Sequence, residues 1–157
     1  MSEASFRASV RASVRGLWSG ALSRSQFNSA LSSAIKRHLQ VAWLEGAKEC
    51  GVLADELSED ETSALAEFIA EQIGYISGFA SGIREGDKVS KRKLQPLLGR
   101  AEMWINRYPD VRNQARVMTC KNKKLTWIYG DTILHCKDCS GYNGKTYRAS
   151  AWEVAGA

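Results

Sequence analysis

The stretch "SEDETSALAEFIAEQIGYISGFASGIR", from Ser58 to Arg84, decides the fold class because it carries the signals of a long amphipathic helix. Ser58 is followed three residues later by Glu61, the capping-box spacing that satisfies free N–H groups at a helix start. Apolar residues then recur every three or four positions, as on one buried helix face: Leu65, Phe68, Ile69, Ile73, Ile76, Phe79 and Ile83. The stretch predicts a helix from about Glu59 to Arg84.

Three glycines lie four residues apart on this helix, at Gly74, Gly78 and Gly82. Each interior glycine lowers helix stability by roughly 1 kcal/mol relative to alanine. Three of them on one stripe therefore predict a compensating contact. We expect close packing against another helix of the same chain. A contact between subunits is the alternative, so self-association is a second expectation.

Helical periodicity also precedes this stretch. It predicts one helix from about Glu3 to Trp18 and a second from a capping residue at Ser25 to Cys50, with Gly51 as the residue that ends it. His38 lies in the second helix beside two basic residues, and we interpret it as a surface residue.

A fourth helical region follows a polar hinge and spans roughly Lys91 to Met118. Pro96 fits its first turn, where the missing N–H costs little. Pro109 predicts an interruption, with one segment ending near Tyr108 and another starting at Asp110.

The pattern changes after residue 118. "KKLTWIYG" is β-branched and aromatic with alternating apolar positions, which predicts a strand, and "KTYRASAW" is its expected partner. We therefore predict a mainly α chain with a small C-terminal β element (α+β). A helical domain of about four helices, residues 1–118, would precede a β-hairpin knuckle that carries a Cys-x2-Cys motif, residues 119–157.

The knuckle holds candidate metal ligands. Cys136 and Cys139 are two residues apart, as for two thiolates that share one zinc ion within a tight turn. With Cys120 and His135 they make a set of four for a structural zinc. The alternatives for the fourth ligand are Asp131, Asp138, Cys50 or a residue outside this chain. Without a secretion signal the cysteines are expected to be reduced. If no metal is bound, the alternatives are that they pack as reduced side chains or that they form a redox pair.

Net charge is +5 and is unevenly placed. Residues 1–83 carry a net charge of −3, and residues 84–148 carry +9. A basic C-terminal half suggests a polyanionic partner, most simply nucleic acid. A solvated basic face, or one that meets an acidic protein, is the alternative. No run of about 18 apolar residues occurs, so no transmembrane span is predicted.

Catalytic motifs are not found in the sequence. It contains no His-Glu-x-x-His, no Gly-x-Ser-x-Gly and no phosphate-binding P-loop. A nuclease constellation can be drawn from His135, Asn143 and Asp138, but only one histidine is within reach of it. We expect a protein that is not an enzyme.

The C-terminal motifs also carry a family resemblance. They are a Trp-bearing strand at Trp127, a Gly-Asp-Thr turn at 130–132, a His-Cys-x2-Cys knuckle at 135–139, Asn-Gly-Lys at 143–145 and Ala-Ser-x-Trp at 149–152. In these motifs the chain resembles the phage Mu F-like minor head family of tailed-phage head-morphogenesis proteins. "LWSGALSRSQFNSAL" and "AWLEGAKECGV" are similar to the helical front of that family, so the resemblance spans roughly Leu17 to Trp152.

This resemblance implies a minor structural protein of a phage head, present in few copies and with no required catalytic residue. It implies portal and capsid proteins as partners, a role in head assembly and in DNA packaging or delivery, and a place in the virion after assembly in the host cytoplasm. Packaged DNA is a further expected partner, through the basic C-terminal half; a membrane is not expected. The alternative function is a stand-alone, zinc-stabilised nucleic-acid-binding module.

Overall fold

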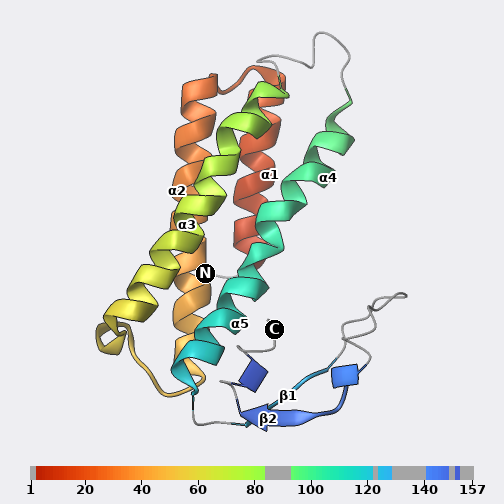
Figure 1. Cartoon of the computed structure of the whole chain (residues 1–157). Helices are drawn as coiled ribbons and strands as arrows, with labels where there is room; N and C mark the ends of the chain where they lie inside the picture. The colour runs from red at the N-terminus through yellow and green to blue at the C-terminus, as the bar shows by residue number, and fades with distance from the viewer. Residues whose placement is uncertain (1–2, 84–92, 122–123, 129–140, 149–150, 153–157) are drawn as a thin grey trace.

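The structure, a computed structural model, describes residues 3–83, 93–121, 124–128, 141–148 and 151–152 (Figure 1). The described helices are α1 (Glu3–Ser19), α2 (Arg24–Lys48), the 3-10 turn η1 (Ala54–Glu56), α3 (Glu59–Ser81), α4 (Leu94–Ile105) and α5 (Arg107–Thr119). The strands are β1 (Lys124–Thr126) and β2 (Thr146–Arg148). The prediction of a mainly α chain with a small C-terminal β element is confirmed.

The helices form an up-and-down bundle, in which α4 and α5 together occupy the place of a fourth helix (Figure 1). α2 contacts α1, α3 and α5, and its contact with α5 is the most extensive in the molecule. Because α2 and α5 run in the same direction, their C-terminal ends lie at the same end of the bundle, beside the β strands.

Side-chain caps set the starts of α2 and α3. The Ser58 hydroxyl accepts the Glu61 N–H (3.2 Å), and the Glu61 carboxylate accepts the Ser58 N–H (2.7 Å), so the predicted capping box is confirmed. The predicted cap at Ser25 is wrong. Ser23 caps α2 instead, because it forms a reciprocal box with Gln26, which lies three residues on.

The break in the fourth helical region lies at Asn106, about three residues before the position predicted from Pro109. Pro109 sits in the first turn of α5, where a backbone N–H has no intrahelical acceptor to lose. Pro96 occupies the same kind of position in α4, as predicted. α5 continues to Thr119, so the predicted boundary between residues 118 and 119 falls in its last turn.

Aromatic side chains fill the centre of the bundle. Trp43 and Trp104 are the largest fully buried side chains. Trp104 meets the ring of Phe79 edge-on, with 5.0 Å between ring centroids, and its indole Nε1–H donates to the carbonyl of Gln72 at 3.0 Å. This buried hydrogen bond ties α4 to the middle of α3.

The glycine stripe of α3 does not make the predicted contact. Gly74 and Gly78 are exposed, and a Cβ added at either would meet nothing within 4 Å. A Cβ at Gly82 would meet the Arg100 guanidinium and the carbonyl of Phe79, both at 3.3 Å. The expectation of close intrachain packing is therefore wrong for the first two glycines, because this face of α3 is turned away from the bundle.

Gly46 on α2 permits the close approach of another helix. A Cβ there would overlap the backbone carbonyl of Arg112 and lie 2.9 Å from the Cβ of Ala115. Real Cβ atoms do not occupy such positions, so the absence of a side chain at Gly46 lets α5 lie directly on α2.

His38 is buried and not a surface residue, contrary to the prediction. Its side chain is 1% exposed, and its ring stacks on Phe6 with 5.0 Å between centroids. Neither ring nitrogen has a hydrogen-bond partner among the described residues. Burial lowers the pKa of His38, and the nearby charge of Arg37 lowers it further.

We predict opposite effects of one substitution at two glycines. Gly46→Ala should destabilise the protein by about 1–3 kcal/mol, because the new methyl group overlaps α5 backbone. Gly74→Ala should stabilise it by roughly 0.5–1 kcal/mol, because it improves helix propensity in open space. Urea unfolding followed by circular dichroism measures both; equal effects would contradict this account of the α2–α5 contact.

We predict that His38 makes the protein less stable in mild acid. The folded-state pKa of His38 is lowered. As the pH falls below about 6.5, His38 therefore becomes protonated in the unfolded chain while it stays neutral in the folded chain. Over this range His38 lowers the free energy of unfolding by up to about 1.4 kcal/mol for each pH unit, until the pH reaches the folded-state pKa. Urea midpoints between pH 7.5 and 5 should fall less steeply in His38→Phe. Gln40→Ala, at an exposed position two residues further along α2, should keep the wild-type slope.

Candidate functional site

The site that the sequence singles out is the C-terminal hairpin, together with its attachment to the bundle. β1 and β2 pair antiparallel, with Leu125 opposite Tyr147 and Thr126 opposite Thr146. The two threonine hydroxyls are 2.6 Å apart, so they hydrogen-bond across the strands. The predicted pairing of "KKLTWIYG" with "KTYRASAW" is confirmed at these residues.

Two backbone hydrogen bonds close the far end of the hairpin. The Trp127 N–H donates to the carbonyl of Lys145 (3.0 Å), and the Gly144 N–H donates to the carbonyl of Trp127 (2.8 Å). Two residues thus oppose one, as in a β-bulge, and Gly144 has φ 77°, a left-handed conformation that favours glycine. The hairpin therefore brings together the two sides of the segment that contains the Cys-x2-Cys motif.

Four aromatic rings form a small core for the hairpin. Trp152 lies at its centre, with ring centroids 5.4 Å from Trp127, 5.5 Å from Tyr142 and 5.2 Å from Tyr147. Its indole Nε1–H donates to the carbonyl of Leu125 at 2.9 Å, and its side chain is only 3% exposed. This cluster gives a two-stranded sheet the burial that it cannot obtain from its strands alone.

The predicted zinc ligands do not meet among the described residues. Cys120 lies at the end of α5 and forms a disulfide with Cys50, at the end of α2. His135, Cys136 and Cys139 fall outside the described residues, as do Asp131 and Asp138. Within the described part of the chain, no group of three or more His, Cys, Asp or Glu side chains could hold a metal ion.

The Cys50–Cys120 bond corrects the expectation that these cysteines are reduced. Their Cα atoms are 5.4 Å apart although 70 residues separate them in sequence. While the bond is formed, Cys120 has no thiolate to offer to zinc, since metal ligation requires the free thiolate. A zinc site in the knuckle would then need its fourth ligand from elsewhere.

The sequence holds a signal for the pairing of Cys50 with Cys120. In an up-and-down bundle the second and fourth helices run parallel, so cysteines at their C-terminal ends lie at the same end of the bundle.

A second link between α2 and α5 lies beside the disulfide. The Glu49 carboxylate forms ion pairs with Arg112 and with Arg116, whose Nε lies 2.8 Å from Glu49 Oε2. The hydrogen bond to Glu49 is the main reason that the pKa of Arg112 is raised. A matching arrangement joins α1 to α4, where Glu102 takes ion pairs from Arg7 and Arg11, each at 2.5 Å.

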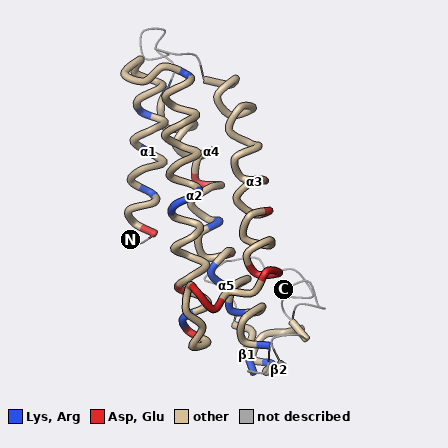
Figure 2. Tube along the Cα trace, turned by 90° about the vertical axis from the view of Figure 1, so that its left-hand side faces the viewer, with Lys and Arg blue, Asp and Glu red and all other residues tan. Residues whose placement is uncertain are grey.

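These ion pairs neutralise part of the positive charge of the basic C-terminal half. Figure 2 shows acidic positions around the end of α2 and the start of α3, next to basic positions on α5 and the hairpin. On α5, Arg107 pairs with Asp110 (2.9 Å), and Arg112 and Arg116 pair with Glu49. Exposed lysines without an ion pair among the described residues lie at the base and on the strands of the hairpin: Lys121, Lys124 and Lys145.

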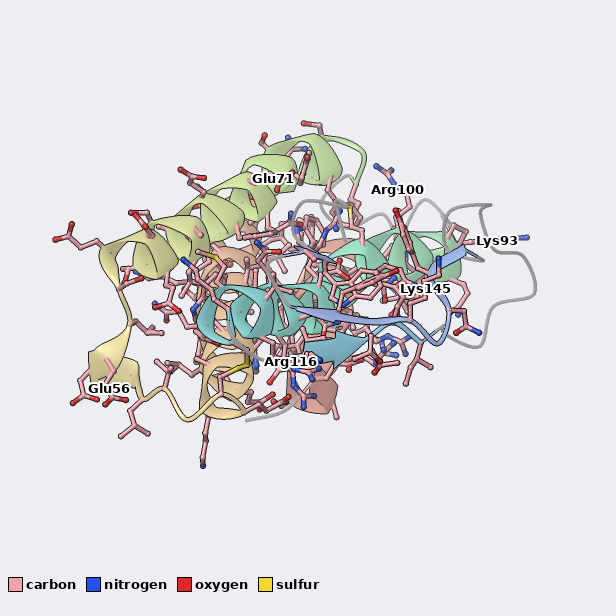
Figure 3. All side chains as sticks on the ribbon, turned by 60° about the horizontal axis from the view of Figure 1, so that its bottom comes forward. Glu56, Glu71, Lys93, Arg100, Arg116 and Lys145 are labelled. Carbon is pink, nitrogen blue, oxygen red and sulfur yellow. A yellow bond between two sulfur atoms is a disulfide. The ribbon has the colours of Figure 1, made fainter. Side chains whose placement is uncertain are left out.

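A half-open groove of about 840 Å³ separates α5 from the hairpin. Its apolar lining comes from Phe68, Val117, Leu125, Trp127, Ile128 and Trp152, and its polar lining includes Asn113 and Gln114. In Figure 3, which views this end of the bundle, Arg116 and Lys145 lie on the hairpin side, while Glu56 lies on the opposite side. The groove combines apolar area with amides and with the charged side chains of Arg107, Asp110 and Arg116.

Comparisons with family models, with curated proteins and with solved structures give no match to this chain. Among the described helices, none is long and apolar enough to cross a membrane. The family resemblance therefore depends on the motif residues alone, and those at 130–132, 135–139 and 149–150 lie outside the described part of the chain.

We predict that Trp152 holds the hairpin together independently of the bundle. Trp152→Ala removes the centre of the aromatic cluster and the hydrogen bond to Leu125, so the hairpin should open. Limited proteolysis should then cut at residues 121–152, while helical circular dichroism stays near the wild-type value. Ile128→Ala, at a side chain that is 77% exposed, is the control and should leave the cleavage pattern unchanged.

Proposed function

We propose that this chain is a non-catalytic minor structural protein of a tailed-phage head. Its role is to aid capsid assembly and DNA packaging or delivery, with portal and capsid proteins as partners. It acts in the virion, after assembly in the host cytoplasm. One observation carries the proposal: motif residues that are far apart in sequence meet in one folded unit, where Trp127 bonds to Gly144 and Lys145 and packs on Trp152.

The way this unit is attached supports a structural role. The bundle has a continuous apolar core, and the hairpin follows directly from α5, the helix most extensively packed on α2. A small recognition element on a rigid helical body suits a protein that bridges larger assemblies. The groove beside the hairpin supplies apolar area for a portal or capsid protein.

Zinc belongs to the proposal as a structural cofactor of the knuckle. Cys136 and Cys139 supply two thiolates and His135 a nitrogen, the donor types that structural zinc takes. Elemental analysis of protein purified without added metal should give about one zinc per chain, and Cys136→Ser should lower this content. Equal thermal stability and equal metal content in that variant would remove zinc from the proposal.

The head-protein function can be tested by comparing phage particles made with the wild-type chain and with a chain whose hairpin is disrupted. Mass spectrometry of purified particles from a phage that encodes this chain should detect it in few copies per head. Trp152→Ala, which is expected to open the hairpin, should not be incorporated, whereas Gly74→Ala, where an added Cβ would meet nothing within 4 Å, should be. If the wild-type chain is absent from intact heads, the proposal fails.

The second candidate is a nucleic-acid-binding module, and the exposed lysines of the hairpin favour it. Lys145 lies over the ring of Tyr142 at 5.9 Å, and Lys121 and Lys124 are exposed nearby. Phosphate contacts of this kind give a binding constant that falls steeply with salt. Changing all three lysines to Gln should weaken DNA binding and flatten its salt dependence. Changing Arg15, Lys36 and Arg37, exposed on the bundle, removes the same charge and serves as the control.

A further inference from the structure

We propose that the Cys50–Cys120 pair is a redox-timed lock. The two thiols are reduced in a reducing cytoplasm (the open lock), and their disulfide forms once the protein is outside it (the closed lock). The timing rests on the proposed function, because a head protein is assembled inside a cell and then released from it. Cellular thiols keep cytoplasmic cysteines reduced, whereas disulfides persist on extracellular particles. The same pair of side chains would thus exist in two covalent states during one life cycle.

The geometry of the helix ends places the two cysteines for this bond. Their Cα atoms are 5.4 Å apart, inside the range of about 4.4–6.8 Å that disulfides require. Cys120 caps α5 and is 6% exposed, while Cys50 follows α2 and is partly exposed. Gly51, with φ 83°, turns the chain away immediately after Cys50.

The contact that positions the cysteines does not depend on the bond. Gly46 lets α5 lie on α2. Glu49, next to Cys50, pairs with Arg116, about one turn before Cys120, and with Arg112, about two turns before it. These groups hold the helix ends together in the reduced protein as well. The thiols are therefore prearranged, and oxidation needs no refolding of the bundle.

Lock closure is a thiol–disulfide exchange with a small disulfide such as oxidised glutathione. The more exposed thiolate, Cys50, attacks one sulfur of glutathione disulfide and displaces a glutathione thiolate, which leaves a mixed disulfide at Cys50. The Cys120 thiolate then attacks Cys50 Sγ and displaces the second glutathione. The protein loses two electrons and two protons overall, and glutathione disulfide is reduced to two thiols.

The closed lock changes how the hairpin is held. β1 begins four residues after Cys120, so a covalent bond at Cys120 fixes the base of the hairpin to α2. The bond also closes a long loop, since 70 residues separate its two ends, and this restricts the unfolded chain. The released particle would carry a hairpin whose base cannot separate from the bundle.

The test compares the full chain before and after oxidation. Protein made in a bacterial cytoplasm is alkylated in intact cells with N-ethylmaleimide, and a second sample is oxidised with glutathione disulfide after purification. Peptide mapping should find alkylated Cys50 and Cys120 in the first sample and a Cys50–Cys120 cross-linked peptide in the second. Oxidation should also raise the melting temperature by roughly 5–15 °C.

Variants separate the lock from a general effect of oxidation. Cys50→Ser and Cys120→Ser should each abolish the oxidation-dependent rise in melting temperature, whereas Gln40→Ala, at an exposed position on α2, should retain it. A Cys120–Cys136 cross-link, or a Cys50–Cys120 bond already complete inside the cells, would overturn the inference. Peptide mapping of the wild-type chain decides the question even if Cys50→Ser fails to fold. If the Cys50–Cys120 bond forms on oxidation but the protein is absent from phage heads, the proposed function is wrong and the exchange reaction still stands. If the protein is present in heads without this cross-link, the lock is wrong and the proposed function still stands.

Discussion

The direct contact between α2 and α5 is the constraint on which the lower end of the molecule depends. It exists because Gly46 offers no side chain to the α5 backbone. The contact places Glu49 between two arginines and brings Cys50 to Cys120. The base of the hairpin is tied to the same contact, since β1 begins five residues after the end of α5. A larger residue at position 46 would disturb all of these features together.

The hairpin shows how a very small β element can be stable beside a helical bundle. Its strands are three residues long, too short to bury an apolar face of their own. Trp152 supplies that burial by packing on the rings of Tyr147 in β2 and of Trp127, which follows β1, and by donating its indole N–H to the carbonyl of Leu125. The chain thus places a second, local core beside the main one, and Trp127 and Trp152, two of the residues on which the proposed family resemblance is based, belong to it.

Local patterns in the sequence were enough to predict the helices, but not their neighbours. Apolar periodicity and the Ser58–Glu61 box specify α3 because they act within one helix turn. Which residues face another helix depends on how the helices pack, and this explains the errors at His38 and at Gly74. For the candidate site, strand pairing was predictable from alternation at Leu125 and Trp127. The Cys50–Cys120 bond joins residues 70 positions apart, and only the order and direction of the helices reveal it.

The exposed glycines of α3 have a consequence for how that helix keeps its form. Gly74 and Gly78 lower its intrinsic helix propensity and supply no side-chain contacts, so this stretch stays helical through the burial of its neighbours Ile76 and Phe79. The paired ends of α2 and α5 are held by ion pairs and a covalent bond and do not share this weakness. α3 therefore depends on its packing against the rest of the bundle for its helical form, whereas the paired ends of α2 and α5 are joined directly to each other.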